Sequence, residues 1–456
     1  MSISISDMSL STETKLIQPN YPNERYAWYV VFILFLVTIL SQLDRQLPTL
    51  LVEPIRAEFA ISDTQFSFLQ GYAFAFVYTL AGLPLGRLVD RKSRRNLIFY
   101  GLIFWSLMTF LAGLATNYWL LFAARMGVGV GEAVLAPAAY SLIADYVAPA
   151  RRGRALGVYY ISIAIGSGAS LVIGGWLLSI IPAGGMLLPG VGHLDAWRWM
   201  FLVAGAPGLL MSVVLFTVRE PVRQEQADIS RTEAQPSIHD VYQFICTQTA
   251  TFSRLLVYPA ILAIIGYGSL AWAPVLFTRK FELHISHSGI LLGSLIAVAG
   301  VLAGLISGFL SDRWVAKGYP SARFRVTLLG QLLLFPTVSL WALMPTPTLS
   351  LAFLFVAILG LSIAQTAAPA AIQEVTPNRM RGQVIAVYLL LGGLLGIGLG
   401  PTLVALVTDY VFHDDNALPW SIALTALPVS LLGVWLTWSG QKPYALTRQA
   451  LVSTES

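Results

Sequence analysis

Two charged residues, Arg125 and Glu132, interrupt the apolar and glycine-rich stretch 118–146, which is long enough to cross a lipid bilayer. A charged side chain near the middle of a membrane helix costs about 2.5–3.5 kcal/mol on insertion scales. Because the two residues are seven positions apart, they share one helix face and lie about 10.5 Å apart along its axis. They must therefore face protein or water. Two interpretations remain, a buried structural ion pair and a working charge site lining an internal cavity, and we favour the second.

A second charged pair, Asp44 and Arg45, lies in the apolar stretch 27–51. Asp44 is about 24 Å along a helix from Trp28, which places it at or just outside the bilayer midplane. Burial favours the neutral form of a carboxylate and a nearby arginine favours the charged form, so Asp44 or Glu132 can bind a proton in one conformation and release it in another. An arginine freed by protonation of its partner can hold a carboxylate or phosphate group of a substrate.

The composition is that of an integral membrane protein. The chain has 456 residues, of which 56% are hydrophobic and 11% charged, with a mean hydropathy of +0.71; soluble domains carry about 25% charged residues. The net charge of +5 does not indicate nucleic-acid binding, because the basic residues cluster at the ends of the apolar stretches. The single cysteine, Cys246, excludes an intramolecular disulfide and offers no metal framework. The first 26 residues do not resemble a cleavable signal peptide.

Twelve apolar stretches have the length of a membrane span, and they form two sets of six. The stretches are 27–51, 65–89, 96–116, 118–146, 153–182, 198–218, 254–279, 286–311, 325–345, 348–374, 382–408 and 417–439. We therefore expect an all-α membrane protein with a tail at 1–26, a six-helix bundle at 27–218, a linker at 219–253, a second six-helix bundle at 254–440 and a tail at 441–456. In the linker, Ile238, Val241, Tyr242 and Ile245 recur at helical spacing, which predicts an amphipathic helix on the membrane surface.

The basic residues predict how the chain is oriented in the membrane. If the even-numbered connections and both termini share one side, that side holds 22 of the 28 lysines and arginines. The opposite loops hold Arg56, Arg198, Arg279 and Lys280, together with the acidic group Asp409, Asp414 and Asp415. Positively charged loops stay in the cytoplasm. We therefore expect a multi-pass protein with both termini cytoplasmic, in the inner membrane if the source is bacterial.

Two motifs recur at nearly the same offset, which indicates a duplicated six-helix unit. GRLVDR at 86–91 is matched by GFLSDR at 308–313, and Arg152-Gly153 is matched by Arg381-Gly382. Transporters built from such repeats bind their substrate between the two halves, near the midplane. Asp90 is placed to accept hydrogen bonds from a neighbouring helix N-terminus. The two copies predict a cytoplasmic gate formed by Gly86, Asp90, Arg91, Arg94, Arg95, Asp312 and Arg313.

With twelve spans, a duplication and the segment GRLVDRKSRR at 86–95, the chain resembles the major facilitator superfamily over nearly its whole length. Within that superfamily it is similar to the spinster-type branch of lipid and sphingolipid transporters. The segments that carry this similarity are DR at 44–45, RMGVGVGEA at 125–133, SLIAD at 141–145, RGR at 152–154 and YY at 159–160. The resemblance implies a central cavity lined by the first, fourth, seventh and tenth spans. Arg45 then either points into that cavity or anchors the outer end of its helix near Glu53 or Glu58.

The C-terminal half carries no charge in the middle of any span. Its candidate substrate contacts are Tyr267, Trp272, Gln365 and Tyr388, although helix packing also explains each of them. A charged half facing an apolar and aromatic half suits an amphiphile with a polar head and an apolar tail. We therefore predict proton coupling at Asp44, Arg125 and Glu132, and substrate binding at Arg45, Arg125 and Glu132 together with the four C-terminal residues.

These features predict a secondary active transporter, not an enzyme, that works as a monomer by alternating access. Its substrate would be a small amphiphilic lipid-like molecule or an organic anion, and a proton gradient would drive it without a cofactor. A proton-driven drug or small-metabolite antiporter and an uncoupled uniporter or flippase are the alternatives. An intramembrane enzyme is disfavoured because the five histidines lie in loops or at the ends of the spans. A metal site in the outer loops is also disfavoured, and nothing resembles the filter of a channel.

Overall fold

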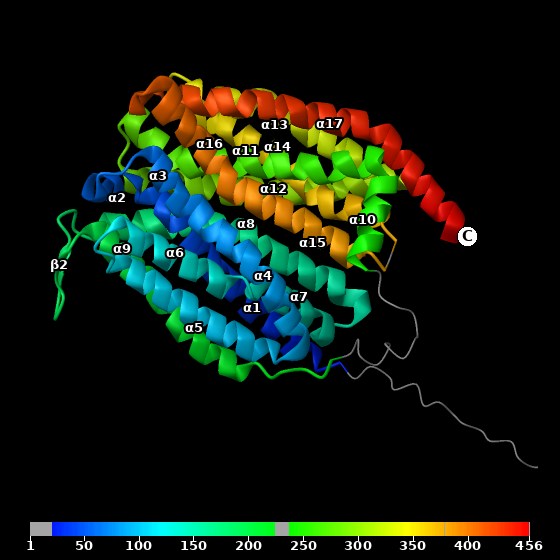
Figure 1. Ribbon diagram of the computed structural model, residues 1–456, viewed down its shortest axis with the longest axis horizontal. Coiled ribbons are helices and arrows are strands. Elements are labelled where there is room, and N and C mark those ends of the chain that lie inside the picture. Colours follow the sequence, from blue (N-terminus) through cyan, green and yellow to red (C-terminus); the bar gives the residue numbers. More distant parts are fainter. Residues whose placement is uncertain (1–20, 224–236, 378, 456) are drawn as a thin grey trace, which may run out of the picture.

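The computed structural model describes residues 21–223, 237–377 and 379–455, and nearly all of them are helical (Figure 1). In these ranges, eleven helices are long and apolar enough to span a membrane, and a twelfth span results if the bent pair Asp63–Gly82 and Pro84–Arg91 is counted as one. The pair is bent by 44° beside Pro84, because proline lacks the N–H that a helix interior requires. The predicted all-α membrane fold is confirmed.

The N-terminal half forms one bundle, in which α1 packs against α8, and α5 packs against α6 and α9. Its elements are α1 (Glu24–Gln46), η1 (Leu47–Leu50), α2 (Val52–Phe59), α3 (Asp63–Ser67), η2 (Phe68–Tyr72), α4 (Ala73–Arg91), α5 (Arg94–Gly113), α6 (Tyr118–Glu132), α7 (Leu135–Tyr146), α8 (Pro149–Ile180), the hairpin of β1 (Met186–Leu188) and β2 (Gly192–Leu194), α9 (Ala196–Val214) and η3 (Leu215–Thr217). The two strands are antiparallel, with Leu187 opposite His193.

The C-terminal half forms a second bundle, in which α13 packs against α14 and α17, and α11 packs against α17. Its elements are α11 (Thr249–Phe281), α12 (Ile285–Ala316), α13 (Ala322–Leu340), η5 (Trp341–Leu343), α14 (Pro347–Glu374), α15 (Arg381–Leu391), η6 (Gly392–Leu399), α16 (Gly400–Val407), η7 (Thr408–Phe412), η8 (Asp415–Ala417) and α17 (Leu418–Glu455). In Figure 1 the blue and cyan helices of the first bundle lie below the yellow and red helices of the second.

The molecule has two chemically different ends. We call the end that carries α2, α3 and the β-hairpin, on the left of Figure 1, the acidic end, because Asp63, Asp409 and Asp415 meet there. The opposite end, where Arg94 begins α5 and Arg381 begins α15, is the arginine-rich end. Each spanning helix runs from one end to the other. A tilt of one bundle against the other therefore opens one end and closes the opposite end.

The seam between the bundles is tight toward the acidic end. A Cβ atom added at Gly168 of α8 would lie 2.5 Å from the carbonyl oxygen of Gly293 in α12. A Cβ at Gly71 of η2 would lie 2.6 Å from the carbonyl oxygen of Ile397 in η6. Only glycine allows two helices to approach this closely. The bundles therefore touch backbone to backbone in this part of the seam.

Toward the arginine-rich end the same helices separate. A Cβ atom added at Gly153 or Gly157 of α8 would meet no atom within 4 Å in the described structure, and the same holds for Gly304 and Gly308 of α12. The other line of contact between the bundles, where η2 meets η6, repeats this pattern. Gly86 of α4 and Gly382 of α15, which continue η2 and η6 toward the arginine-rich end, also face open space. The conformation is therefore closed at the acidic end and open at the arginine-rich end.

The linker and the C-terminal segment continue as helix. The predicted amphipathic helix is α10 (Ile238–Thr247), whose Val241 is buried and whose Phe244 ring packs 5.3 Å from that of Phe252. Tyr242, expected on the same apolar face, is instead 64% exposed. The helix α17 runs on to Glu455, so the described part of the predicted tail at 441–456 is a helical extension of the last span. The predicted tail at 1–26 lies mostly outside the described residues.

Candidate functional site

Glu132 is the last residue of α6, and its carboxylate lies inside the N-terminal bundle with no exposed surface. Its Oε2 accepts hydrogen bonds from Arg45 Nε and Ser41 Oγ, both at 2.7 Å. The ion pair between Arg125 and Glu132 that the sequence allowed is absent from the described structure. The partner of Glu132 is Arg45. Of the two orientations predicted for Arg45, the structure therefore shows the one that points into the protein and not the one near Glu53 or Glu58.

Arg125 and Asp44 complete this group, and both are almost fully buried. Arg125 Nη1 donates a hydrogen bond of 3.0 Å to the main-chain oxygen of Asp44. Within the described residues, Asp44 Oδ1, Glu132 Oε1 and Arg125 Nε have no hydrogen-bond partner. A buried polar atom without a partner costs about 1–3 kcal/mol. We call Asp44, Arg45, Arg125 and Glu132 the charge network; it has spare capacity to bind a proton or a polar group.

Arg45 connects the charge network to the space between the bundles. Its side chain is 19% exposed, whereas that of Glu132 is fully buried. The guanidinium carbon lies 4.6 Å from the ring centroid of Phe74 and 4.9 Å from that of Tyr78. Aromatic faces attract a guanidinium group at these distances. Arg45 is therefore held between a carboxylate and two rings and still presents part of its surface.

Two of the predicted residues of the C-terminal bundle face this region. Tyr267 of α11 is 40% exposed and lies close enough to Arg45 and Tyr78 to interact electrostatically with both. Tyr388 of α15 is half-buried and has Tyr160 and Tyr267 as electrostatic neighbours. The fold therefore brings tyrosines of one bundle opposite the charges of the other.

The other two predicted residues of the C-terminal bundle lie elsewhere. Trp272 has no exposed surface, because its Nε1 donates a 2.9 Å hydrogen bond to the carbonyl oxygen of Pro401 and its ring packs edge-on against Phe66. It belongs to the seam and cannot contact a substrate in this conformation. Gln365 of α14 is half-buried, and no hydrogen bond joins it to the charge network in the described part of the chain.

A cluster of aromatic residues was missed by the sequence analysis. The Tyr140 ring of α7 lies 5.4 Å from Tyr159 and 5.9 Å from Tyr160, both on α8. Tyr78 of α4 stacks on Phe74 at 5.3 Å beneath Arg45. The only sequence signal was the pair Tyr159-Tyr160, because single aromatic residues in apolar helices are indistinguishable from packing residues.

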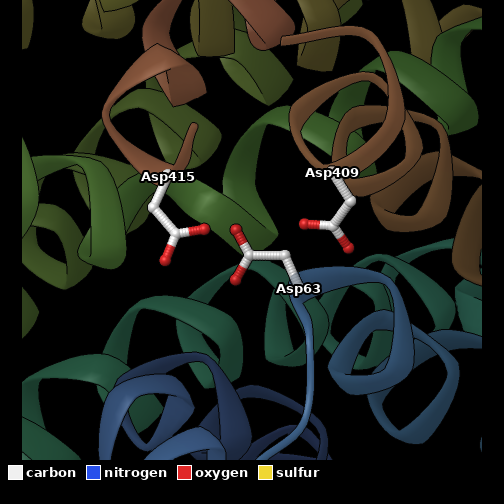
Figure 2. A group of neighbouring side chains, drawn as sticks. All are labelled: Asp63, Asp409 and Asp415. Carbon is white, nitrogen blue, oxygen red and sulfur yellow. The ribbon is translucent and has the colours of Figure 1, made fainter. Parts of the chain in front are cut away.

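Three carboxylates from the two bundles meet at the acidic end, as Figure 2 shows. Asp63 of α3, Asp409 of η7 and Asp415 of η8 have oxygen atoms within 4.8 Å of one another. Arg279 of α11 donates hydrogen bonds of 2.7 and 2.9 Å to Asp63, and Arg56 of α2 lies 3.1 Å from Asp63 and 2.9 Å from Asp415. Arg56 and Arg279 pair with Asp63 and Asp415, and Asp409 accepts a hydrogen bond of 2.7 Å from the main-chain N–H of Thr64. Because each carboxylate has a protein partner, we assign the group to ion pairing and hydrogen bonding rather than to a metal. We call the ion pairs of Arg56 and Arg279 the latch.

The local sequence explains where Asp63 lies, but not what it binds. Ser62 and Gln65 form a capping box at the start of α3, so Asp63 occupies the first helical turn, where a carboxylate is favoured by the helix dipole. Arg279 lies 216 positions further along the chain. The sequence predicts Arg56 and Arg279 in the outer loops, and no local signal pairs them with Asp63.

At the arginine-rich end, Arg94 is almost fully buried and forms ion pairs with Asp145 and with Glu220, the latter at 2.7 Å. Glu220 also accepts hydrogen bonds from Ser93 Oγ at 2.8 Å and from the main-chain N–H of Arg95 at 2.9 Å. Burial by itself raises the pKa of Glu220, but these hydrogen bonds prevail and hold its pKa below the usual range. We call Arg94, Asp145 and Glu220 the Arg94 cage; it ties three segments of one bundle together.

The remaining residues of the predicted gate are exposed. Asp90 and Arg91 at the end of α4, and Asp312 and Arg313 at the end of α12, lie at the surface. The expected hydrogen bonds between Asp90 and a neighbouring helix N-terminus are not formed among the described residues, and a Cβ at Gly86 would face open space. The physical reason is the separation of the bundles at this end. Among the described residues of the predicted gate, Arg94 and Arg95 are the ones whose side chains form hydrogen bonds or ion pairs with other segments.

Comparison with known proteins agrees with this architecture. Residues 34–443 match the family model of the Major Facilitator Superfamily. An MFS-type efflux pump of Mycolicibacterium smegmatis is 28% identical over 426 residues, which are 92% of this chain and 94% of the relative. A probable L-galactonate transporter of Escherichia coli is 26% identical over 66% of this chain and 65% of its own length.

The fold is also similar to a solved structure. A bacterial homolog of the human lysosomal transporter Spinster, in its inward-facing and unoccupied conformation, superimposes with a TM-score of 0.77 at 25% sequence identity, covering 95% of this chain and 99% of that one. The predicted resemblance to the spinster-type branch is confirmed.

Proposed function

The chain belongs to the Major Facilitator Superfamily of transporters, and from that premise we propose that it is a proton-coupled secondary transporter for an organic anion or an anionic amphiphile. The proposal includes alternating access by a single chain, with a proton gradient as the driving force and no cofactor. The observation that carries it is the hydrogen bond between the buried Glu132 and the partly exposed Arg45.

The mechanism follows from the chemistry of that bond. While Glu132 is ionised, it holds the Arg45 guanidinium and keeps it from other anions. A proton on Glu132 removes the charge, and Arg45 then offers its donors to a carboxylate or phosphate of the substrate. Because proton and substrate both act on the same arginine, their binding is coupled. Asp44 and Arg125 sit behind this pair and set its electrostatic environment.

The nature of the substrate is inferred from both bundles and from the relatives. Arg45 and Arg125 favour an anion, and galactonate, which names one relative, is a carboxylate. The tyrosines of both bundles around Arg45 offer apolar faces as well as hydroxyl groups, which suits an amphiphile, in keeping with the spinster-type resemblance. A sugar acid and a lysolipid share one feature, a single anionic group that an arginine can hold.

The proposed orientation places the arginine-rich end in the cytoplasm, because basic loops stay on that side. The conformation described above is then the inward-facing one, and the latch closes the outer side. Alternating access would separate Arg279 from Asp63 while bringing Asp90 and Asp312 into contact with the opposite bundle. The charge network lies between these two gates, where a substrate can reach it from either side in turn.

The test uses purified protein in proteoliposomes that contain a pH-sensitive dye, with single additions of galactonate, a lysolipid and a sphingoid phosphate. We expect one anion to move protons with the wild type, and Glu132→Gln to abolish this proton movement. Asp240→Asn, at the surface of α10, is the matched control and keeps the wild-type response. Equal substrate movement without proton movement in all three proteins contradicts the proposal and indicates a uniporter or flippase.

A second candidate function is drug or small-metabolite efflux, which the similarity to the mycobacterial efflux pump favours. The same vesicles separate the two candidates. Proton movement triggered by cationic drugs and not by any of the anions indicates an antiporter of drugs. In that case Arg45→Gln has little effect, whereas an anion carrier loses its substrate affinity with this substitution.

A further inference from the structure

A cavity of about 830 Å³ lies at the acidic end, apart from the charge network. The N-terminal bundle contributes η1, α2 and the facing ends of α8 and α9, and the C-terminal bundle contributes the end of α11 and the turn 282–285. Part of its lining is apolar, with Leu51, Val275 and Trp197 almost fully buried. This volume is in the range of sites that enclose a small organic molecule.

The charged groups of the cavity are mainly acidic. Four carboxylates and His284 line it, and no lysine or arginine does so among the described residues. Glu53 and Glu58 are already paired, with Arg279 and Arg198 respectively. Asp195, the residue before α9, and Glu282, the residue after α11, are exposed and have no ion-pair partner in the described ranges. Two carboxylates with free capacity therefore stand at the rim of an apolar space.

Trp197 fixes the geometry of one wall. Its Nε1 donates a hydrogen bond of 2.6 Å to Glu58 Oε2, and its ring packs edge-on against Phe59 and Phe201. The ring is therefore held in place whether or not the cavity is filled. A preformed apolar wall next to uncompensated carboxylates is complementary to a cation that carries an apolar body, and it repels the anions proposed as substrate.

We propose that this cavity is a regulatory site for an amphiphilic organic cation, such as a long-chain quaternary amine. The walls belong to both bundles, so the complete site exists only while the acidic end is closed. A ligand that binds one conformation shifts the population toward it. Occupation of the cavity therefore holds the transporter closed at the acidic end and slows its turnover without competing for the charge network. The inhibition rests on the proposed transport cycle; the binding itself does not.

Binding is tested directly on the full chain in lipid nanodiscs, with decyltrimethylammonium as the probe and decanol as the uncharged control. Titration calorimetry and the shift of the melting temperature report binding without any transport assay. We expect the cation to bind and to stabilise the wild type, and the double variant Asp195→Asn/Glu282→Gln to weaken its binding roughly three- to tenfold. The affinity for decanol stays unchanged in that variant.

Two further variants keep the test decisive. Ala57→Trp, at an exposed lining position on α2, fills the cavity and weakens the binding of both probes. Asp414→Asn removes an exposed carboxylate outside the lining and leaves binding unchanged. Equal affinity of the cation for the wild type and the double variant overturns the proposal, as does a cation effect that Ala57→Trp does not alter. If the wild type binds the cation but no anion moves protons in the vesicle assay even without the cation, the proposed function is contradicted and this site is not.

Discussion

At the acidic end, ion pairs join the two bundles: Arg279 of the C-terminal bundle bonds to Asp63 and Glu53 of the N-terminal one. At the arginine-rich end, the ion pair of Arg94 with Glu220 and that of Arg323 with Glu374 each stay within one bundle. Pairs within a bundle can persist in every conformation, whereas pairs between bundles must break whenever that end opens. The two ends therefore have different physical roles. The latch holds the two bundles together at the acidic end, whereas the Arg94 cage at the other end stabilises a single bundle, and we call it the brace.

The latch contains a feature that lowers the cost of opening. Removing one partner of a buried ion pair costs about 3–5 kcal/mol, because it leaves an uncompensated charge. Asp63 is fully buried, but it is also 3.1 Å from Arg56, which belongs to the same bundle. When Arg279 moves away, Asp63 retains Arg56. The latch can thus be specific for one conformation without making the other inaccessible.

The largest expected effect is on the brace. Arg94→Ala removes a buried guanidinium from Asp145 and Glu220, and we expect it to lower the free energy of unfolding by about 3–5 kcal/mol. The melting temperature in detergent measures this loss. The exposed Arg91→Ala is the matched control and changes it little. If Arg94→Ala keeps the wild-type melting temperature and instead shifts the balance between the two conformations, the distinction between brace and latch is wrong.

Next in size is the latch. Arg279→Gln removes both of its pairs to the N-terminal bundle, and we expect the equilibrium to shift toward opening of the acidic end by about 2–5 kcal/mol. Spin labels at the exposed positions Ala57 and Asp414, in a Cys246→Ser background, report the distance between the bundles.

Lys280→Gln is the control for the latch variant, because within the described part of the chain the ammonium group of Lys280 donates hydrogen bonds to two carbonyl oxygens of its own bundle, those of Ala342 and Met344. We expect its distance distribution to match the wild type. A longer distance in Lys280→Gln than in Arg279→Gln would show that the pairs of Arg279 do not hold the bundles together.

A smaller effect, of opposite sign at the two ends, is expected from the glycines of the seam. Gly168→Val places side-chain atoms against the backbone of α12 and destabilises this conformation by about 1–3 kcal/mol. Gly304→Val fits here, where the added atoms meet open space, and obstructs closure of the arginine-rich end. The same spin labels should show a longer distance for the first variant and no lengthening for the second. A change of the label distance in the same direction in both variants would contradict a motion in which one end of the seam closes as the other opens.

The smallest expected effect is a pH dependence in the brace. The folded pKa of Glu220 is held below its unfolded value of about 4.3, so its contribution to stability is present above that pH and is lost as the pH falls through the folded pKa. Glu220→Gln should therefore be less stable than the wild type at pH 7, by about 1 kcal/mol or less, and the difference should vanish as the pH falls below the folded pKa of Glu220. A difference in stability that does not shrink as the pH is lowered would show that the charge of Glu220 is not involved.

Much of the fold could be predicted because the membrane restricts it. Apolar stretches of spanning length must form helices, which satisfy their own backbone hydrogen bonds, and the start of α3 was signalled by the capping residues Ser62 and Gln65. The burial of Asp44, Arg125 and Glu132 followed from the cost of charge in lipid. Trp272 shows the limit of this reasoning, because an aromatic residue in an apolar helix packs in the seam or lines a cavity with the same local sequence.

What the sequence by itself determined is the number of spans, the duplication and the presence of buried charges, since each of these follows from local composition and the properties of a bilayer. Only the tertiary structure decided which charges meet. Glu132 bonds to Arg45 across 87 positions of chain rather than to Arg125 on its own helix, and Asp63 bonds to Arg279 across 216. The tertiary structure also decided which end is closed and which is open, because a glycine permits two helices to approach closely but does not require it. Partner choice depends on how distant helices are arranged in space, which no local pattern encodes.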